Sequence, residues 1–286
     1  MGNHRRRRAE ERFFKALMII ATGIVMGSLL LIVGTIVVKG FPALNLDMIT
    51  KTPKGGYYLG KEGGILNAIL GSLYLAGGAT LLAFLLSLPL ALFLDMETRS
   101  KSGAALRVRF ALDVLWGIPS IVYGAFGFLI MALVGLRASL LAGIIIVALL
   151  ELPIMARSMD EVVRLVPAAL KDASASLGAT RLETAVRVVL RQCLPGLLTA
   201  VLIAFGRGVG DAASVLFTAG FTDSLPTSLF QPAATLPLAI FFQLGTPFPE
   251  VRARAYASAA VLTLIILIVS LAARWLSRKL KKHTIQ

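Results

Sequence analysis

The chain has 286 residues, of which 57% are hydrophobic and only 15% are charged, and its formal net charge is +14. Soluble domains average about 45–50% apolar and about 25% charged residues. The composition therefore excludes an ordinary soluble domain and indicates a polytopic membrane protein. The single cysteine, Cys193, excludes an intrachain disulfide and a cysteine metal cluster.

Long apolar runs predict the membrane-spanning segments, each of which needs about 20 apolar residues. We expect an all-α fold with six transmembrane helices: Phe13–Val38, Leu66–Leu94, Phe110–Val134, Ser139–Met155, Leu194–Ala219 and Tyr256–Leu276. The first run is too long for a signal-peptide core and no cleavage motif follows it. We therefore expect the N-terminus to be retained.

These runs divide the chain into two basic tails, a first-helix segment with an outer loop, and a core domain of five transmembrane helices. The four parts are, in chain order, 1–12, 13–65, 66–276 (the core) and 277–286. Within the core, residues 156–195 form a loop on the cytoplasmic side and residues 221–254 form an outer loop.

Lysine and arginine are distributed unevenly between the two predicted sides. Most of the 29 basic residues lie in the two tails and in the loops 95–109 and 156–191. The positive-inside rule then places both termini and the 156–195 loop in the cytoplasm. Because the charges are split among loops at the ends of apolar spans, we expect them to contact anionic membrane lipid and not nucleic acid.

The polar stretch from Pro167 to Pro195 predicts two helices separated by a sharp stop. Pro167 suits the first turn of a helix, and Gly178 is placed to end that helix in a left-handed conformation. Thr180 followed by Glu183 is typical of a capping box that opens a second helix. We call this segment the elbow.

Two features of the elbow indicate how it packs. Helical spacing gives the second helix an apolar face made by Leu182, Val186, Val189 and Cys193. The residues flanking Gly178 are small, so another protein surface can approach the backbone closely; they are Ala173, Ser174, Ala175, Ser176 and Ala179. These features favour a docking role.

The third apolar run contains four residues that disfavour a regular helix: Gly117, Pro119, Gly124 and Gly127. The backbone groups freed there must be satisfied by a neighbour or by a water-lined cavity. Ser120 and Tyr123 either donate hydrogen bonds into such a cavity or bond back to their own helix. Asp113 and Glu151 lie near predicted span ends, so we expect both at the membrane interface.

The fifth run carries Arg207 near its centre and Asp211 four residues later, on the same helical face. An arginine within the membrane costs about 2.5–3.5 kcal/mol on insertion scales, so it should face the interior of the bundle. Two interpretations stay open. The pair neutralises itself and joins helices, or Arg207 meets a passing anion while Asp211 holds the guanidinium. The planar guanidinium suits a tetrahedral oxyanion.

The sequence gives no sign of nucleotide or metal chemistry. Gly55–Lys61 fits G-x-x-x-x-G-K, but Glu62 stands where a nucleotide-binding loop needs Ser or Thr. We therefore expect that the chain binds no cofactor, is not an enzyme, and leaves any ATP and magnesium to a partner. In the outer loop, Leu236–Leu244 is too short to span a membrane and predicts a re-entrant or interfacial helix.

The elbow resembles the EAA loop of bacterial ABC importer permeases. That loop contains E-A-A, then three intervening residues and Gly, and later a Leu-Pro pair. This chain has Asp172-Ala173-Ser174, then Gly178-Ala179, then Leu194-Pro195. Asp172 replaces the usual Glu and Ser174 replaces the second Ala, and both changes are conservative.

Two further segments are similar to the phosphate permeases of that superfamily. One is Pro119–Gly124 with Phe126-Gly127, and the other is Gly206–Asp211 with Leu216–Gly220. The family form of the second segment ends in Glu, so the side chain of Asp211 is one methylene shorter. The resemblance covers nearly all of residues 66–276.

This resemblance implies the type I importer fold and a permease subunit of an ATP-driven phosphate importer in the inner membrane. It implies a sister permease, an ATPase dimer on the cytoplasmic side and a phosphate-binding protein outside. The residues it assigns to ATPase coupling are Asp172, Ala173, Ser174, Gly178, Ala179 and Thr180. The residues we assign to the phosphate route are Arg207, Asp211, Ser120 and Tyr123.

Other functions stay open on the sequence alone. The first alternative is a permease for another oxyanion, such as molybdate, sulfate or phosphonate. An ion-coupled secondary transporter is the second; such proteins need no ATPase and often contain inverted repeats, of which we find no convincing example. A structural membrane scaffold is the third and would carry no flux.

Overall fold

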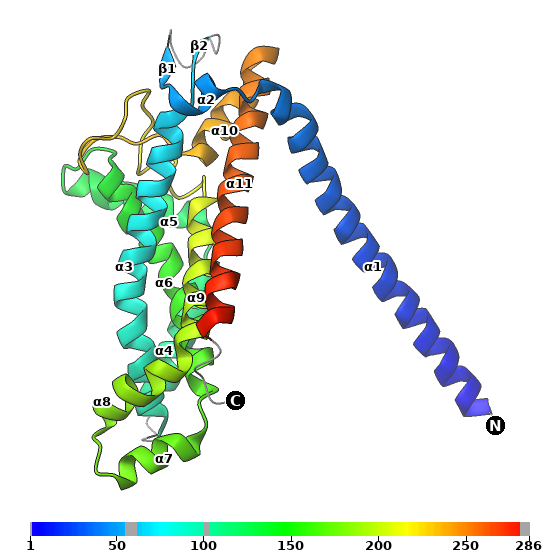
Figure 1. Ribbon diagram of the computed structural model, residues 1–286, viewed down its shortest axis with the longest axis vertical. Helices are drawn as coiled ribbons and strands as arrows, with labels where there is room; N and C mark the ends of the chain where they lie inside the picture. The colour runs from blue at the N-terminus through cyan, green and yellow to red at the C-terminus, as the bar shows by residue number, and fades with distance from the viewer. Residues whose placement is uncertain (1, 55–61, 100–102, 281–286) are drawn as a thin grey trace.

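The computed structural model describes residues 2–54, 62–99 and 103–280, and most of them are helical (Figure 1). The larger helices are α1 (Gly2–Gly40), α3 (Leu66–Arg99), α4 (Gly103–Gly117), α5 (Ser120–Leu133), α6 (Leu140–Arg164), α9 (Leu190–Val209) and α11 (Pro249–Leu280). The shorter elements are η1 (Phe41–Ala43), α2 (Leu46–Thr50), α7 (Ala168–Ser176), α8 (Arg181–Glu183), η2 (Thr184–Val189) and α10 (Leu236–Leu244). An antiparallel pair, β1 (Pro53–Lys54) and β2 (Glu62–Gly63), completes them.

The bundle is built around α3, α6 and α9, with α4 and α11 packed on the outside (Figure 1). Its main apolar cluster joins Leu75 of α3, Val147 and Met155 of α6, and Ala204 of α9. Of the most apolar stretch of α6, 72% of the residues are buried within the bundle, against none for α1. The α6 helix is therefore the centre of the fold.

The bundle has two distinct ends. The α7 end carries the elbow, and the β end carries β1, β2, α2 and α10 (Figure 1). Helix α1 begins, and α11 ends, toward the α7 end. The first and last described helices therefore have their outer ends on the same side of the molecule, as the six predicted membrane crossings require.

Among the described residues, five helical segments are long and apolar enough to cross a membrane, and the α4–α5 pair makes a sixth crossing if it is counted as one span. The third predicted run is not one irregular helix, because α4 and α5 are bent by 96°. Gly117 ends α4, and Pro119, which has no N–H to continue a helix, precedes α5. Gly124 and Gly127 do not interrupt α5, contrary to our expectation.

The boundaries of the fourth and fifth runs also differ from the prediction. Helix α6 continues past Met155 to Arg164, so the first part of the predicted 156–195 loop is helical. Helix α9 ends at Val209, and residues 210–219 form turns, so the span predicted to reach Ala219 is wrong over that stretch. The closely spaced Gly206, Gly208 and Gly210 weaken the helix there.

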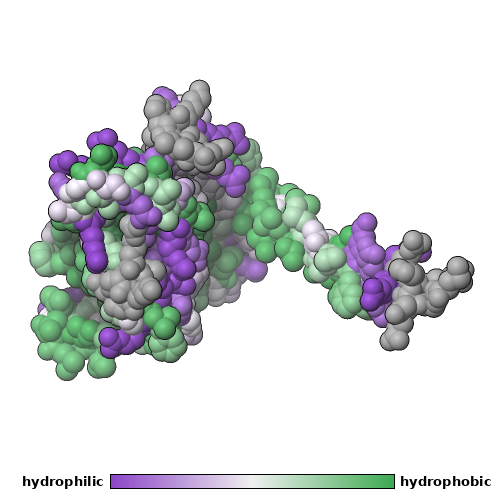
Figure 2. Space-filling view, turned by 90° about the horizontal axis from the view of Figure 1, so that it is seen from below, coloured by the Kyte–Doolittle hydropathy of each residue, from purple (hydrophilic) through white to green (hydrophobic). Residues whose placement is uncertain are grey.

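Helix α1 stands apart from the bundle along most of its length (Figure 1). It meets the bundle near its C-terminal end, where Gly40 lies against the backbone of Tyr256 and the Lys39 ammonium lies 5.1 Å from the Tyr256 ring centre. Viewed from the α7 end, the projecting helix is hydrophobic until its hydrophilic first turns (Figure 2). Such a surface belongs in lipid or against another membrane helix.

At the β end, α10 has the bounds that the sequence predicts and packs against α3 and α11. Leu236 and Leu238 are buried, and the Leu236 N–H donates to the Ser72 hydroxyl at 2.8 Å. The backbone at Gly71 lies against Ala234, an approach that leaves no room for a side chain. The Gly55–Lys61 segment lies outside the described residues.

Candidate functional site

The elbow has the local structure that the sequence predicts. Gly178 adopts the left-handed conformation with φ of +81°, and the Ala179 N–H donates to the Ser174 carbonyl at 3.2 Å, closing the end of α7. The Thr180 hydroxyl accepts from the Glu183 N–H at 3.2 Å, and the Glu183 carboxylate accepts from the Thr180 N–H at 2.9 Å. The capping box is confirmed.

The helix after the capping box packs differently from the prediction. Val189 and Cys193 are buried as expected, but Leu182 and Val186 are 63% and 46% exposed. The π-helical segment η2 has a wider turn than an α-helix, so Leu182 before it and Val186 within it no longer share a face with Val189 and Cys193. Thr184 is buried in their place, and its hydroxyl lies 2.9 Å from the Ser174 hydroxyl of α7.

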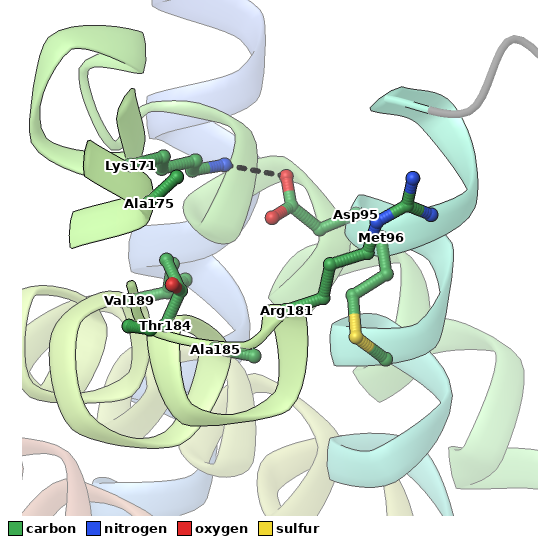
Figure 3. A pocket seen from close by; sticks show the side chains of 9 residues that line it. Asp95, Met96, Lys171, Ala175, Arg181, Thr184, Ala185 and Val189 are labelled. Carbon is green, nitrogen blue, oxygen red and sulfur yellow. Dashed lines mark hydrogen bonds and ion pairs between the residues drawn. The ribbon is translucent and has the colours of Figure 1, made fainter. Parts of the chain in front are cut away.

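A buried ion pair joins the elbow to the bundle. Figure 3 shows Lys171 of α7 pointing toward Asp95 near the end of α3, with an Nζ to Oδ1 distance of 2.5 Å. The surrounding cavity, about 50 Å³, is far below the roughly 300–1,000 Å³ of ligand pockets. It is lined by Asp95, Met96, Lys171, Ala175, Ala179, Arg181, Thr184, Ala185 and Val189. This region is a structural joint.

Removing one partner of this joint should loosen the elbow. In Lys171→Met, Asp95 is left buried without its cation, an arrangement that costs about 3–5 kcal/mol. We expect the backbone amides of α7 to exchange hydrogen faster in that variant, with little change in α6. The double variant Lys171→Met with Asp95→Leu should restore slow exchange, and unchanged exchange in the single variant would show that the pair does not hold α7.

The predicted coupling residues lie together on the elbow surface. Asp172, Ala173, Gly178 and Thr180 are exposed, and Ser174 and Ala179 are partly buried. Three large apolar side chains are exposed around them: Leu177, Leu182 and Val186. The elbow therefore presents a mixed apolar and polar surface at one end of the bundle, suited to a protein partner.

Arg207 and Asp211 do form an ion pair, with a distance of 3.0 Å between Nη1 and Oδ1. Arg207 lies in the last turn of α9 and not near the centre of a span, and Asp211 lies in the turn that follows. The side chains differ in burial, with Arg207 43% exposed and Asp211 only 2% exposed. Arg207 is therefore the partner that remains accessible.

Asp211 has a second function in the local structure. Its carboxylate accepts hydrogen bonds from the Ser214 N–H at 2.8 Å and from the Ser214 hydroxyl at 2.5 Å. These bonds begin the turns that replace the predicted helix after Val209, a role for which aspartate is well suited. Asp211 therefore anchors the backbone while it holds the Arg207 guanidinium.

Helix α5 packs against the same turns. A Cβ added at Gly124 would collide with Ala213 and Ser214, and one added at Gly127 would collide with Ile146. Tyr123 is buried, and its hydroxyl donates to the Leu115 carbonyl of α4 at 2.9 Å, so it satisfies the break between α4 and α5. Ser120 is half-buried in the first turn of α5.

Glu151 was expected at the membrane interface, and that expectation is wrong. The residue lies in the middle of α6 and is fully buried. Its carboxyl packs so closely against Gly208 of α9 that a Cβ there would collide with it. The Thr80 hydroxyl of α3 interacts with the carboxyl, but neither carboxylate oxygen makes a hydrogen bond of normal geometry within the described part of the chain.

This buried carboxyl should reduce the stability of the bundle. A buried polar group without a hydrogen bond costs about 1–3 kcal/mol, so Glu151→Met, of similar length, should raise the free energy of unfolding by about that amount. Glu151→Gln, which stays polar, should gain less. Denaturant unfolding in detergent measures the free energy of unfolding of the two variants and the wild type. A Glu151→Met protein less stable than the wild type would contradict this prediction.

Sequence analysis missed a charge network between α4 and α6. The Arg109 guanidinium donates to both carboxylate oxygens of the fully buried Asp160, each at 2.7 Å. Arg157 bridges Asp160 at 3.2 Å and Asp113 at 2.7 Å. Asp113 is exposed. The sequence feature that indicates this network is the three-residue spacing of Arg157 and Asp160, which lie within the predicted 156–195 loop.

The long apolar helices and their packing define a polytopic α-helical membrane protein. Its structure is similar to the methionine ABC transporter MetNI in inward-facing conformations, with a TM-score of 0.64 and 20% identity, covering 76% of this chain and 95% of that one. It is also similar to a bacterial ABC transporter involved in the import of the acidic polysaccharide alginate, with a TM-score of 0.54 and 18% identity, covering 93% and 99%. The predicted importer permease fold is confirmed.

Residues 87–282 match the family described as binding-protein-dependent transport system inner membrane component, and the chain belongs to that family. It is 34% identical over 249 residues to the phosphate transport system permease protein PstA of Xylella fastidiosa strain 9a5c, covering 85% of this chain and 83% of that protein. It is 33% identical over 241 residues to PstA of Haemophilus influenzae, covering 84% of each. The chain is a multi-pass inner-membrane protein.

Proposed function

We propose that this chain is the permease subunit of an ATP-driven importer of inorganic phosphate. The observation that carries the proposal is the similarity, at about a third identity over most of the chain, to proteins named as phosphate permeases. The exposed Arg207 guanidinium beside the buried Asp211 supports it, because guanidinium groups bind phosphate oxygens through paired hydrogen bonds. The protein transports its substrate and leaves ATP hydrolysis to partner subunits.

The proposed assembly places the α7 end in the cytoplasm. Most of the basic residues belong to the tails and loops of that side, which the positive-inside rule assigns to the cytoplasm. The partners are a PstC-like sister permease, a dimer of PstB-like ATPase subunits and a PstS-like phosphate-binding protein. The ATPase dimer binds ATP and magnesium and contacts the elbow, while the binding protein delivers phosphate at the β end.

A continuous helical segment supports the proposed coupling between the elbow and Arg207. The segment Arg181–Val209 is continuously helical through α8, η2 and α9, a length of about 40 Å at 1.5 Å per residue. The Lys171–Asp95 pair and the Ser174–Thr184 contact hold α7 against the start of this rod. A movement of the elbow is therefore transmitted to the guanidinium that meets phosphate.

Reconstitution tests this function. Liposomes containing all the subunits, with the binding protein outside and ATP inside, should accumulate labelled phosphate. Uptake should depend on ATP and persist when a proton uncoupler is added, which separates it from secondary transport. Excess sulfate or molybdate should compete poorly. Competition by either oxyanion at the level of unlabelled phosphate would assign the permease to that substrate. Uptake without ATP would contradict the proposed ATP-driven import.

A further inference from the structure

A cavity of about 420 Å³ lies between α9 and α11, separate from the elbow joint. Its volume is within the roughly 300–1,000 Å³ range of small-molecule pockets. It is lined by Thr199, Leu202, Ile203 and Gly206 of α9 and by Ser270, Ala273, Arg274, Ser277 and Arg278 of α11. Because α11 ends toward the α7 end, the arginines occupy that part of the cavity.

The cavity is basic on one side and carries hydroxyl groups on both. Arg274 and Arg278 are one helical turn apart, so their side chains extend from the same face of α11, and both are exposed. No acidic residue lines the cavity, and within residues 2–54, 62–99 and 103–280 neither arginine forms an ion pair with a carboxylate.

Two residues that line the cavity, one from each helix, share a backbone acceptor. The Thr199 hydroxyl donates to the Pro195 carbonyl at 3.1 Å from within α9, and the Ser277 hydroxyl reaches the same carbonyl from α11 at 3.5 Å. The Ser277 contact joins α11 to α9 in the same helical turn that carries Arg274 and Arg278.

We propose that this cavity binds a phosphate group. Two guanidinium groups one turn apart can donate paired hydrogen bonds to the oxygens of one phosphate, and the Ser270 hydroxyl adds a further donor. The apolar residues Leu202, Ile203 and Ala273 line the part between the helices. The phosphate is carried by an anionic phospholipid or is free inorganic phosphate.

Each source has support in the structure. A basic pocket between membrane helices on the cytoplasmic side is a typical site for anionic lipid head groups. For free phosphate, which rests on the proposed transport function, the argument is alignment. Thr199, Ile203 and Arg207 recur every four residues on the exposed face of α9, so the cavity lies directly along the helix from Arg207.

The test compares wild type with the double variant Arg274→Gln with Arg278→Gln, as the full transporter in nanodiscs. The lipid arm measures the increase in thermal midpoint when phosphatidylglycerol replaces phosphatidylcholine. The phosphate arm measures retention of labelled inorganic phosphate in phosphatidylcholine alone. We expect affinity for one probe to fall about fivefold for each arginine removed, following the energy of one basic side chain at an anionic surface.

Two control variants make the result specific. Lys279→Gln removes a neighbouring charge that packs over the Trp275 ring at 5.3 Å and does not line the cavity, so it should bind both probes normally. Arg274→Lys with Arg278→Lys keeps the charge without the planar fork and should bind with intermediate affinity.

Each outcome bears on the proposal. Loss of the phosphatidylglycerol effect alone assigns the site to lipid, and loss of phosphate retention alone assigns it to the substrate. Wild-type behaviour of the double glutamine variant in both arms, or an equal loss in Lys279→Gln, overturns the proposal. Because the lipid arm needs no transport, a transporter that fails to move phosphate would remove the proposed function and leave this site testable.

Discussion

Phosphate uptake should fall about tenfold or more in Gly178→Val, while the sister permease and the ATPase still co-purify with the variant. Gly178 has φ of +81°, which costs a residue with a Cβ about 1–2 kcal/mol and more if it is β-branched. Apart from the two adjacent residues, no atom of the described part of the chain lies within 4 Å of the position that a Cβ would occupy. The substitution therefore acts through the backbone of the elbow and not through a clash.

The choice of replacement separates strain from simple loss of glycine. Asparagine tolerates the left-handed conformation, so Gly178→Asn should keep most of the uptake. Gly103→Val is a second control, because Gly103 also has open space at its Cβ but does not have a positive φ. Wild-type uptake by Gly178→Val, measured with labelled phosphate in liposomes, would remove the elbow from the coupling mechanism.

The elbow was predictable because its structure is set by neighbouring residues. A glycine that ends a helix and a threonine three residues before a glutamate act within one or two turns, and both Gly178 and Thr180 behave as their sequence indicates. The π-helical segment η2 was not predictable in this way. Its wider turn buries Thr184 against Ser174 of another helix, a contact between elements that periodicity alone does not contain.

The prediction of where the spans end was wrong for a related reason. Hydropathy placed the end of the fourth run at Met155 because Arg157 and Asp160 follow it. In the structure Asp160 is neutralised by Arg109, which lies 51 residues earlier in the chain, and α6 continues through both charges. A charge ends a span only where it finds no partner inside the protein, and the partner is a property of the fold.

Glu151 and the α9–α11 cavity were missed because both depend on residues far apart in the sequence. Glu151 is enclosed by α3, α6 and α9, and only their packing shows that its carboxyl meets Gly208. The sequence prediction places Arg274 at the end of the last span and Arg278 in the basic tail 277–286. In the structure, residues of α9 lie opposite them, and the two helices together line a cavity.

The Arg207→Gln variant should lose phosphate uptake by about tenfold or more while the assembled transporter remains stable. The ion pair leaves Arg207 43% exposed, and Asp211 keeps its two hydrogen bonds from Ser214 when the guanidinium is removed. The charge that we propose to meet phosphate is therefore lost, while the turn after α9 is retained. One charge-assisted hydrogen-bonding group contributes about 1.5–3 kcal/mol, which corresponds to at least a tenfold change.

Two companion variants distinguish a phosphate contact from a structural pair. Arg207→Lys keeps the charge but not the bidentate fork, so uptake should be intermediate and the apparent affinity for phosphate should weaken more than the maximal rate. Asp211→Asn should instead lower the thermal stability of the transporter, because the buried acceptor of the Ser214 bonds is altered. If Arg207→Gln transported phosphate normally but unfolded as readily as Asp211→Asn, the pair would only join the end of α9 to the turns that follow it.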